Sequence, residues 1–498
     1  MIPGILFAAA SSGCGKTTIT CGALRAWQRK GLKIKAWKCG PDYIDPMFHK
    51  QVLGIPGGNL DSFFLSKEAL KAQYQQKNVG FDLAVMEGVM GYYDGLGGIS
   101  TQASTYEVAQ AVDVPVILIL DGKGVSLSLA AMLRGFLQYQ KDSHIVGVIL
   151  NRTSPMIGAR LKPVLEAEGV KYFGCVPVSK EIQFDSRHLG LVMPEEVPQI
   201  QKQLDEIADL LEKSVDLDRI LEMARSYAKK QENMEGEYIS NQEDTENQSF
   251  MKILNSSQMI NENVGLAKCQ TSQVSMETRA AGSFTESRKP LRIAVARDEA
   301  FCFYYQENME ILESLGVELI PFSPIHDQEL PAKISGVILG GGYPENYAKA
   351  LSENTSMLAS IRQAWENKMP FLAECGGFLY LHRELEGSDG IFYPLAGVIP
   401  DKAWKTNRLG RFGYITLTPD HPDTCLIRKI KGHEFHYWES GDCGTCWTAK
   451  KPLSDRSWSC VHSEQGQIAG FPHLYYPSAP EFAEQWLEMC RKWSRTVS

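Results

Sequence analysis

The sequence lacks long apolar runs. No stretch of about 18 consecutive apolar residues occurs in its 498 residues, which argues against a membrane-spanning helix. The opening segment MIPGILFAAASSGCGK also lacks the basic flank and long apolar core of a secretory signal peptide. We therefore expect a cytoplasmic protein with no membrane partner.

An excess of positive charge is missing too. The chain has 51 Lys and Arg against 59 Asp and Glu, a net charge of -8. Nucleic-acid binding requires a basic surface that neutralises phosphates, so this composition argues against a general nucleic-acid partner. Any anionic ligand must be held by local groups.

A disulfide framework is absent as well. The 12 cysteines are scattered without regular spacing, which indicates reduced thiols. Cys443 and Cys446 form a single C-x-x-C pair with no second pair to match it. We interpret this pair as structural rather than as a zinc or redox site.

What the sequence does contain is two regions of strand and helix alternation. Up to about residue 224, apolar runs such as GILFAAA, FDLAVME, VPVILILD and IVGVILN alternate with helix-like segments. This pattern predicts a parallel sheet with helices on both faces. Residues 225–290 are polar and weakly periodic, which is typical of a linker or insertion. Strand-like runs resume afterwards, so we expect two α/β domains, at 1–224 and 291–498.

The segment SSGCGKTT joins the first strand to a helix-like segment. Such a glycine-rich turn is typical of the phosphate-binding loop of P-loop NTPases, with backbone N–H groups around the phosphates. Lys16 would contact the β- and γ-phosphate oxygens and Thr17 would contact magnesium. We therefore expect ATP and Mg²⁺ as cofactors, with ATP bound by Gly13, Gly15, Lys16, Thr17 and Thr18.

Two acidic clusters follow apolar runs, in WKCGPDYIDPMFH and FDLAVMEGVMGYYDG. In a parallel sheet both loops lie at the carboxyl edge, beside the phosphate loop, where ligands bind. Carboxylates gathered there suit magnesium with its bridging phosphates. We expect metal binding by Thr17, Asp42 and Glu87, and catalytic roles for Asp45 and Asp94. Which acid serves the metal and which the substrate stays open, because some could only cap turns.

Asn151 ends the run IVGVILN, at a position where an adenine or ribose contact could form. An Asn at a strand end is equally often a turn former, so both interpretations stay open.

Cys375 lies in PFLAECGGFLYL, between an apolar run and two glycines. Free cysteines are most often small core residues. A strand-to-helix turn with tight-turning glycines is, however, also the setting of an exposed nucleophile. The residue type alone does not choose between these two roles.

Several segments together resemble one family. KCGPDYIDPMFH, NLDSFF, EGVMGYYDG and DSRHLGLV, followed by GGGYPE, AECGGFLYL, RFGYI, GHEFHYWES and GFPHLYY, are similar to the cobyrinic acid a,c-diamide synthase family. The family's N-terminal domain is similar to dethiobiotin synthetase and its C-terminal domain is a class I glutamine amidotransferase. The resemblance covers nearly the whole chain except about residues 225–290.

The resemblance implies that Cys375 is the glutaminase nucleophile and His473 its base. The helix N-terminus after Cys375 would favour its thiolate. His433 and His436 would frame the site or face the synthetase domain. The family's usual third triad member, a Glu two positions after the histidine, is Tyr475 here, so a Cys-His dyad is expected. Backbone N–H groups of an oxyanion hole would come from Gly341, Gly342 and Gly376.

The implied reaction is an ATP-dependent amidation. The synthetase domain would transfer the γ-phosphate to a carboxylate, and ammonia from glutamine would displace the phosphate. The implied substrate is cobyrinic acid, amidated on its c and then its a acetate side chain. Its carboxylates would be bound by Lys38, Asp42, Arg187 and His188, though Arg187 could equally form a structural ion pair. The sequence leaves the oligomeric state open.

Three other interpretations stay open. The first is a sister amidase: cobyric acid synthase has the same two-domain plan but acts at four other side chains, and nickel-sirohydrochlorin a,c-diamide synthase resembles this chain closely. A partition-type ATPase with an inactive amidotransferase-like module is disfavoured because Ser11 replaces the lysine usual in such ATPases. A dethiobiotin-type synthetase with an unrelated tail would leave the C-terminal motifs without explanation.

Overall fold

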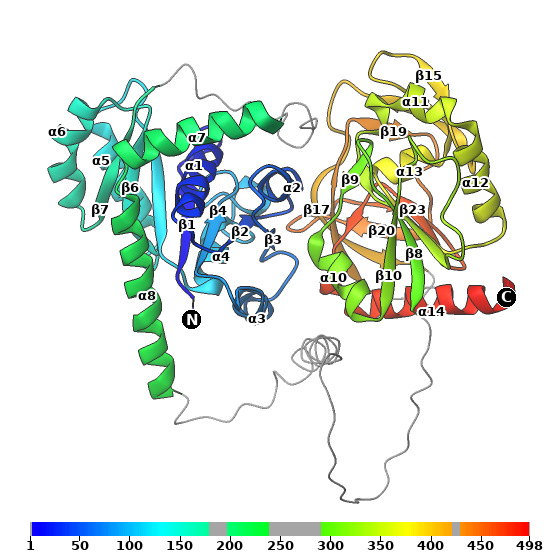
Figure 1. Cartoon of the computed structure of the whole chain (residues 1–498), viewed down its shortest axis with the longest axis horizontal. Helices are drawn as coiled ribbons and strands as arrows, with labels where there is room; N and C mark the ends of the chain where they lie inside the picture. Colours follow the sequence, from blue (N-terminus) through cyan, green and yellow to red (C-terminus); the bar gives the residue numbers. More distant parts are fainter. Residues whose placement is uncertain (1, 179–196, 239–289, 421–428, 498) are drawn as a thin grey trace, which may run out of the picture. The chain divides into compact units, whose positions relative to one another are not determined.

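The computed structural model describes residues 2–178, 197–238, 290–420 and 429–497. They form two compact units (Figure 1).

The first unit is built on a seven-stranded parallel sheet in the order β3-β2-β4-β1-β5-β6-β7. Its central strand β1 lies between β4 and β5, where the strand order reverses, and ligands of open α/β sheets bind beyond the carboxyl ends at such a point. The strands are β1 (Gly4–Ala9), β2 (Ile34–Cys39), β3 (Gly57–Leu60), β4 (Leu83–Glu87), β5 (Val116–Asp121), β6 (Ile145–Asn151) and β7 (Lys171–Val176).

Helices cover both faces of this sheet. Ile5, Phe7 and Ala9 of β1 share a core with α1, α7 and α8, whereas Gly4 faces Tyr74 of α3 on the other side. Serine side chains cap the N-termini of α3, α4 and α6. The helices are α1 (Lys16–Arg29), α2 (Ile44–Gln51), α3 (Lys67–Lys77), α4 (Thr105–Val112), α5 (Ser128–Tyr139), α6 (Pro155–Glu166), α7 (Val197–Ser214) and α8 (Leu217–Tyr238), with the 3₁₀ turn η1 (Leu96–Gly98).

Helix α8 runs past residue 224, where the sequence predicted the start of a polar linker. It continues to Tyr238, and Ala224, Ala228 and Gln231 keep a buried face along it. A single narrow buried stripe is enough to hold a helix whose remaining positions are polar, and that is why composition alone placed the boundary too early. The rest of the predicted linker, residues 239–289, lies outside the described residues.

The second unit has a six-stranded sheet in the order β10-β8-β11-β13-β23-β22, parallel except for β22. The pair β9 and β12 and sheets of four and five strands complete the unit. Its strands are β8 (Leu291–Ala296), β9 (Phe301–Phe303), β10 (Val317–Phe322), β11 (Gly336–Leu339), β12 (Gly341–Gly342), β13 (Phe371–Glu374), β14 (His382–Glu386), β15 (Phe392–Pro394), β16 (Ile399–Lys405), β17 (Phe412–Pro419), β18 (Ile430–Phe435), β19 (Trp438–Ser440), β20 (Trp447–Lys450), β21 (Ser457–Cys460), β22 (His462–Glu464), β23 (Gln467–Gly470) and β24 (His473–Leu474).

Two apolar cores flank the six-stranded sheet. Phe371 of β13 faces the core that includes α12, while Leu372 faces the core of α14, which buries Phe482 and Trp486. This alternation is the period of a strand buried on both faces. The helices are α10 (Gln306–Ser314), α11 (Ala348–Glu353), α12 (Thr355–Glu366), α13 (Gly376–Tyr380) and α14 (Pro480–Val497), with 3₁₀ turns η3 (Pro344–Asn346) and η4 (Tyr476–Ser478).

The prediction of two α/β domains is confirmed by these sheets. Within the described ranges, no helix combines the length and the apolarity needed to cross a membrane.

Candidate active site

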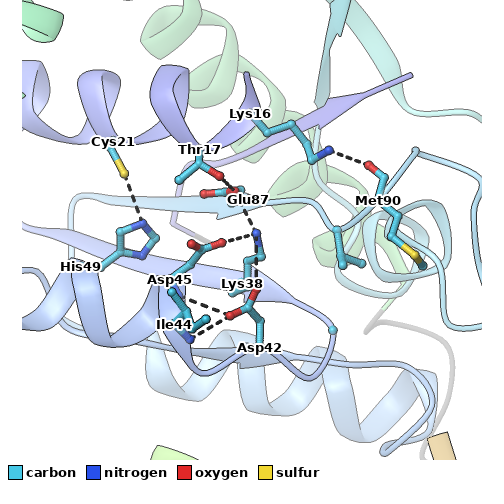
Figure 2. A network of polar contacts seen from close by, with 12 residues as sticks. Lys16, Thr17, Cys21, Lys38, Asp42, Ile44, Asp45, His49, Glu87 and Met90 are labelled. Atoms are coloured by element: carbon cyan, nitrogen blue, oxygen red, sulfur yellow. Dashed lines mark hydrogen bonds and ion pairs between the residues drawn. The ribbon is translucent and has the colours of Figure 1, made fainter. Parts of the chain in front are cut away.

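The turn between β1 and α1 holds the predicted phosphate-binding lysine. Lys16 Nζ donates to the backbone oxygen of Met90 at 2.6 Å (Figure 2). It also donates to the backbone oxygen of Ser11 at 3.1 Å. Burial and the nearby ammonium of Lys38 lower the pKa of Lys16. An ammonium in this setting gains stability from an added anion, so the position suits a phosphate.

The glycines of this turn are required by its geometry. Gly13 and Gly15 have φ of 76° and 89°, the left-handed region that glycine adopts without strain. A Cβ on Gly15 would also lie 2.1 Å from Nδ2 of Asn151. The backbone conformation therefore favours glycine at both positions, and the close approach of Asn151 is a second reason at Gly15.

Asn151, predicted near adenine or ribose, lies against the phosphate loop. Its Nδ2 donates to the backbone oxygen of Cys14 at 2.8 Å. The next residue, Arg152, pairs with Asp121 at the end of β5 and donates to the backbone oxygen of Gly13 at 3.2 Å. The carboxyl ends of β5 and β6 therefore tie down the loop.

A cluster of charged side chains lies below the loop (Figure 2). Thr17 Oγ1 donates to Glu87 Oε1 at 2.6 Å, and Lys38 Nζ contacts the same oxygen at 2.8 Å. Lys38 also pairs with Asp45 and lies 3.9 Å from Oδ2 of Asp42. Three of the four acids predicted at this edge thus converge on one lysine, which neutralises much of their repulsion.

The charges of this cluster are set by burial and by Lys38. Burial opposes the charge of Lys38, but Asp45, Glu87 and Asp42 outweigh it and raise its pKa well above the ordinary value. Burial likewise works against ionised Asp45, yet Lys38 lowers the pKa of Asp45 overall. Burial and the charge of Asp45 raise the pKa of Glu87 to about 7 and that of Asp42 to about 6.

Among the described residues, Asp94 and Thr18 of the predicted site are not part of the cluster around Lys38. Asp94 Oδ2 accepts from the backbone N–H of Gly91 at 2.8 Å, within its own loop, and its charge favours the protonated form of Lys16. Thr18 lies in the first turn of α1. Arg187 and His188 lie outside the described residues.

The residues around Thr17 fit a magnesium ion bound together with phosphates. Glu87 is fully buried, and its Oε2 has no hydrogen-bond partner among the described residues. No group of three or more His, Cys, Asp or Glu in the described ranges could hold a metal by itself. Mg²⁺ is usually held by one or two carboxylates with substrate phosphates and waters, which matches a hydroxyl beside a free carboxylate oxygen.

In the second unit, Cys375 forms a sharp turn between β13 and α13. Its φ of 48° and ψ of -100° are unfavourable for a residue with a side chain. The turn is held by hydrogen bonds from Cys375 N to Gly470 O at 2.8 Å and from Leu379 N to Cys375 O at 2.9 Å. A strained residue between a buried strand and a helix is the arrangement of a nucleophile elbow.

The thiol of Cys375 is held in its neutral form. Burial, followed by the charges of Glu345 and Glu434, raises its pKa, although the N–H of Gly376 opposes the change. The N–H of Gly376 at the start of α13 does favour thiolate, as the sequence led us to expect, but burial and the nearby acids outweigh it in the free site.

His473 is a buried neutral imidazole beside the glycine loop. Its Cε1 would lie 2.4 Å from a Cβ on Gly341, and its ring stacks on His433 with centroids 4.9 Å apart. Burial, His433 and His436 lower its pKa well below the ordinary value. A neutral imidazole can accept a proton, as a general base must. His436 instead stacks on Phe471 and pairs with Glu434.

The predicted oxyanion glycines lie between the turn and this histidine. A Cβ on Gly376 would approach Gly342 N to 3.0 Å, and Gly341 borders His473. Gly377 N donates to Gly340 O at 2.9 Å, which fixes the start of α13 against this loop. The three glycines thus share one small region of backbone with His473.

Sequence reasoning missed one neighbour of His473. Glu374 Oε2 lies 4.0 Å from His473 Nδ1. Its place beside Cys375 was visible in AECGG, but nothing local in the sequence shows that it faces a histidine on another strand.

Comparison with known proteins matches both units. Residues 5–192 match the CobQ/CobB/MinD/ParA nucleotide binding domain, and residues 292–470 match the CobB/CobQ-like glutamine amidotransferase domain. A solved structure of the MinD cell division protein from Aquifex aeolicus has 17% identity over 43% of this chain and 98% of its own, with a TM-score of 0.28, which is too low to support an argument.

Curated relatives extend over the full chain. A cobyrinate a,c-diamide synthase from Listeria innocua is 34% identical over 97% of this chain and 98% of its own length. The enzyme of that name from Salmonella typhimurium is 34% identical over 98% of each chain. The chain therefore belongs to the CobB/CbiA family of nucleotide-binding glutamine amidotransferases of cobalamin biosynthesis.

Proposed function

We propose that this chain uses ATP and glutamine to amidate the c and then the a acetate carboxylate of cobyrinic acid through acyl phosphates. The observation that carries the proposal is the full-length similarity to cobyrinate a,c-diamide synthases, at 34% identity over 97% of the chain. The phosphate loop on the first unit and the strained cysteine turn on the second supply the two chemistries that this reaction needs.

In the synthetase step, an oxygen of the substrate carboxylate attacks the γ-phosphorus of ATP, and the bond to the departing ADP breaks. Lys16 would balance charge on the phosphates, and Gly13, Gly15 and Thr18 would bind ATP together with it. Thr17 and Glu87, with Asp42 close by, would hold magnesium, which would neutralise phosphate charge. Asp45 and Asp94 remain the proposed catalytic residues. Asn151 holds the phosphate loop through the hydrogen bond that its side chain donates to the backbone oxygen of Cys14.

Lys38, Arg187 and His188 remain the proposed ligands of the substrate carboxylates, together with Asp42. The ammonium of Lys38 is buried and paired with Asp45 and Glu87. Lys38 therefore first serves to hold these two acids together. Binding of an acceptor carboxylate by Lys38 requires the displacement of one of them.

In the glutaminase step, Cys375 gives its proton to His473 and the thiolate attacks the side-chain amide carbon of glutamine. The N–H groups around Gly341, Gly342 and Gly376 stabilise the oxyanion. His473 returns the proton to the departing ammonia, and water hydrolyses the thioester to glutamate. Ammonia then attacks the acyl phosphate, the amide forms and phosphate leaves.

The test is product analysis with purified full-length protein. Cobyrinic acid, ATP, Mg²⁺ and glutamine should give one monoamide that rises and then falls as the a,c-diamide forms, with one ATP and one glutamine consumed per amide. A product with four new amides would indicate cobyric acid synthase. Turnover of nickel-sirohydrochlorin without turnover of cobyrinic acid would replace the substrate.

Of the two alternatives of another kind, the comparisons weaken one. The amidotransferase match over residues 292–470 removes the unrelated tail that a dethiobiotin-type synthetase would need. A partition-type ATPase with an inactive amidotransferase module would hydrolyse no glutamine, so a glutaminase assay tests it directly.

A further inference from the structure

Glu374 contacts the segment that carries the glutaminase histidine at several points. Its Oε2 lies 4.0 Å from Nδ1 of His473, and its Oε1 accepts from the hydroxyl of Tyr476 at 3.3 Å. The backbone N–H of Leu474 donates to the same carboxyl group. One side chain, directly before Cys375, thus connects the nucleophile turn to the segment of the base.

The segment itself is fixed from the other side by Asn308. Its Nδ2 donates to Leu474 O at 2.8 Å, and its Oδ1 accepts from Tyr476 N at 2.9 Å. These two bonds position the backbone without touching the imidazole. Tyr475, at the position of the family's usual acid, cannot supply a carboxylate to the imidazole.

We propose that Glu374 is the positioning residue of the glutaminase base, so that the site is a Cys-His-Glu triad in which the acid comes from the strand of the nucleophile. The inference rests on the proposed glutaminase activity. Nδ1 is the imidazole nitrogen of His473 that lies 4.0 Å from Oε2 of Glu374. A carboxylate that accepts from Nδ1–H leaves Nε2 free to take the proton of Cys375.

The proposed role requires Glu374 to change its charge during the reaction. Burial raises the pKa of Glu374 to about 8, so a neutral carboxyl group predominates at neutral pH in the free site. Glu374 faces His473, Tyr476 and the adjacent Cys375, while His473 is also faced by His433 and His436. When His473 takes the thiol proton, its positive charge favours ionised Glu374.

The experiment compares Glu374→Gln, Glu374→Asp and Tyr476→Phe in the full-length protein. We expect Glu374→Gln to lower kcat for glutamine hydrolysis about tenfold or more with little change in KM, because an amide can hold the ring in the wrong tautomer. In Glu374→Gln, the part of the pH profile of kcat/KM that rises with pH should no longer reflect the ionisation of Glu374. Glu374→Asp should restore part of the rate, and Tyr476→Phe should shift the profile slightly.

Controls separate this inference from the proposed function. Glu464→Gln makes the same chemical change on β22, where the carboxylate pairs with Lys368 at the surface, and should behave as wild type. Ammonium-dependent synthesis should be retained in every variant. A wild-type protein without glutaminase activity would overturn the proposed function itself.

Two results would overturn the positioning role while leaving the glutaminase intact. One is a Glu374→Gln variant with the rate and pH profile of wild type. The other is an equal loss in Glu374→Gln and Glu374→Asp with an unchanged profile, which would indicate a purely structural carboxyl group. If Glu374→Gln does not fold, Glu374→Asp and Tyr476→Phe decide by their pH profiles, and unchanged profiles in both count against the proposal.

Discussion

Both candidate sites bury ionisable groups, but the buried groups are charged at one site and neutral at the other. At the phosphate loop, Lys38 stays charged because Asp45, Glu87 and Asp42 surround it. At the cysteine turn, burial raises the pKa of the thiol and lowers that of His473, so both groups are neutral. Burial keeps a charge only where an opposite charge is built beside it. The first arrangement suits phosphate and metal chemistry, and the second suits proton transfer.

The largest expected effect is at the cysteine turn. Cys375→Ala should reduce glutamine-dependent amidation by about 10⁴-fold or more, because the thiol forms the covalent intermediate. Amidation with ammonium salts should continue, since the charged site is unchanged. Quantifying the amide by mass spectrometry with each nitrogen source measures both activities, and loss of both would contradict the division between the two sites.

The next effect concerns the base. His473→Ala should lower glutamine hydrolysis by about 10²- to 10³-fold, because proton transfer is then left to water. His433→Ala should cost less, since the proposal gives His433 a supporting role in which it stacks on the ring of His473. Steady-state glutaminase rates compare the two variants. A greater loss in His433→Ala would show that the base was assigned wrongly.

At the charged site, Lys16→Ala should slow synthesis about 10²-fold with glutamine and with ammonium alike, because both routes need the phosphates of ATP to be bound. Basal glutaminase should survive. ATP consumption and amide formation, followed together, make the measurement. Normal synthesis with either nitrogen source would remove Lys16 from the site.

Lys38→Met tests the charged cluster through stability. Removing the ammonium leaves the buried Asp45 and Glu87 and the half-buried Asp42 without their shared partner, and should destabilise the first unit by about 3–5 kcal/mol. Lys30→Met is the matched control, because Lys30 pairs with Asp218 at the surface. Thermal unfolding of the full chain compares them. Equal transition temperatures for the two variants would mean that the acids are neutral in the folded protein.

The smallest effect is the response of the second unit to acid. Burial lowers the pKa of His433 from 6.5 to about 3, so the folded state binds fewer protons than the unfolded chain below about pH 6.5. Stability contributed by this group is full above pH 6.5 and is lost as pH falls toward 3, by about 2 kcal/mol at pH 5. Unfolding measured between pH 7 and 5 should show a shallower loss for His433→Phe than for wild type. An identical slope would indicate that His433 is charged when folded.

The sequence alone determined the features that depend on neighbouring residues. A strand, a glycine-rich turn and a helix follow each other around Lys16, and Cys375 lies on a similar junction, so both turns could be predicted from local patterns. The alternation of apolar runs and helices predicted the parallel sheet in the same way. One local prediction failed: α8 continues past residue 224. Its few buried positions are outnumbered by polar residues, so the composition of this segment resembles that of a linker.

Only the tertiary structure decided which distant groups meet and what charge they carry. Lys38 joins Asp45 and Glu87 because β2 and β4 are neighbours in the sheet, and Asn151 reaches the loop because β6 ends at the same edge. Glu374, at the end of β13, lies 4.0 Å from His473 of β24, a proximity that the sequence did not reveal. Protonation follows from burial and from the nearest charges, and both exist only once the chain is folded.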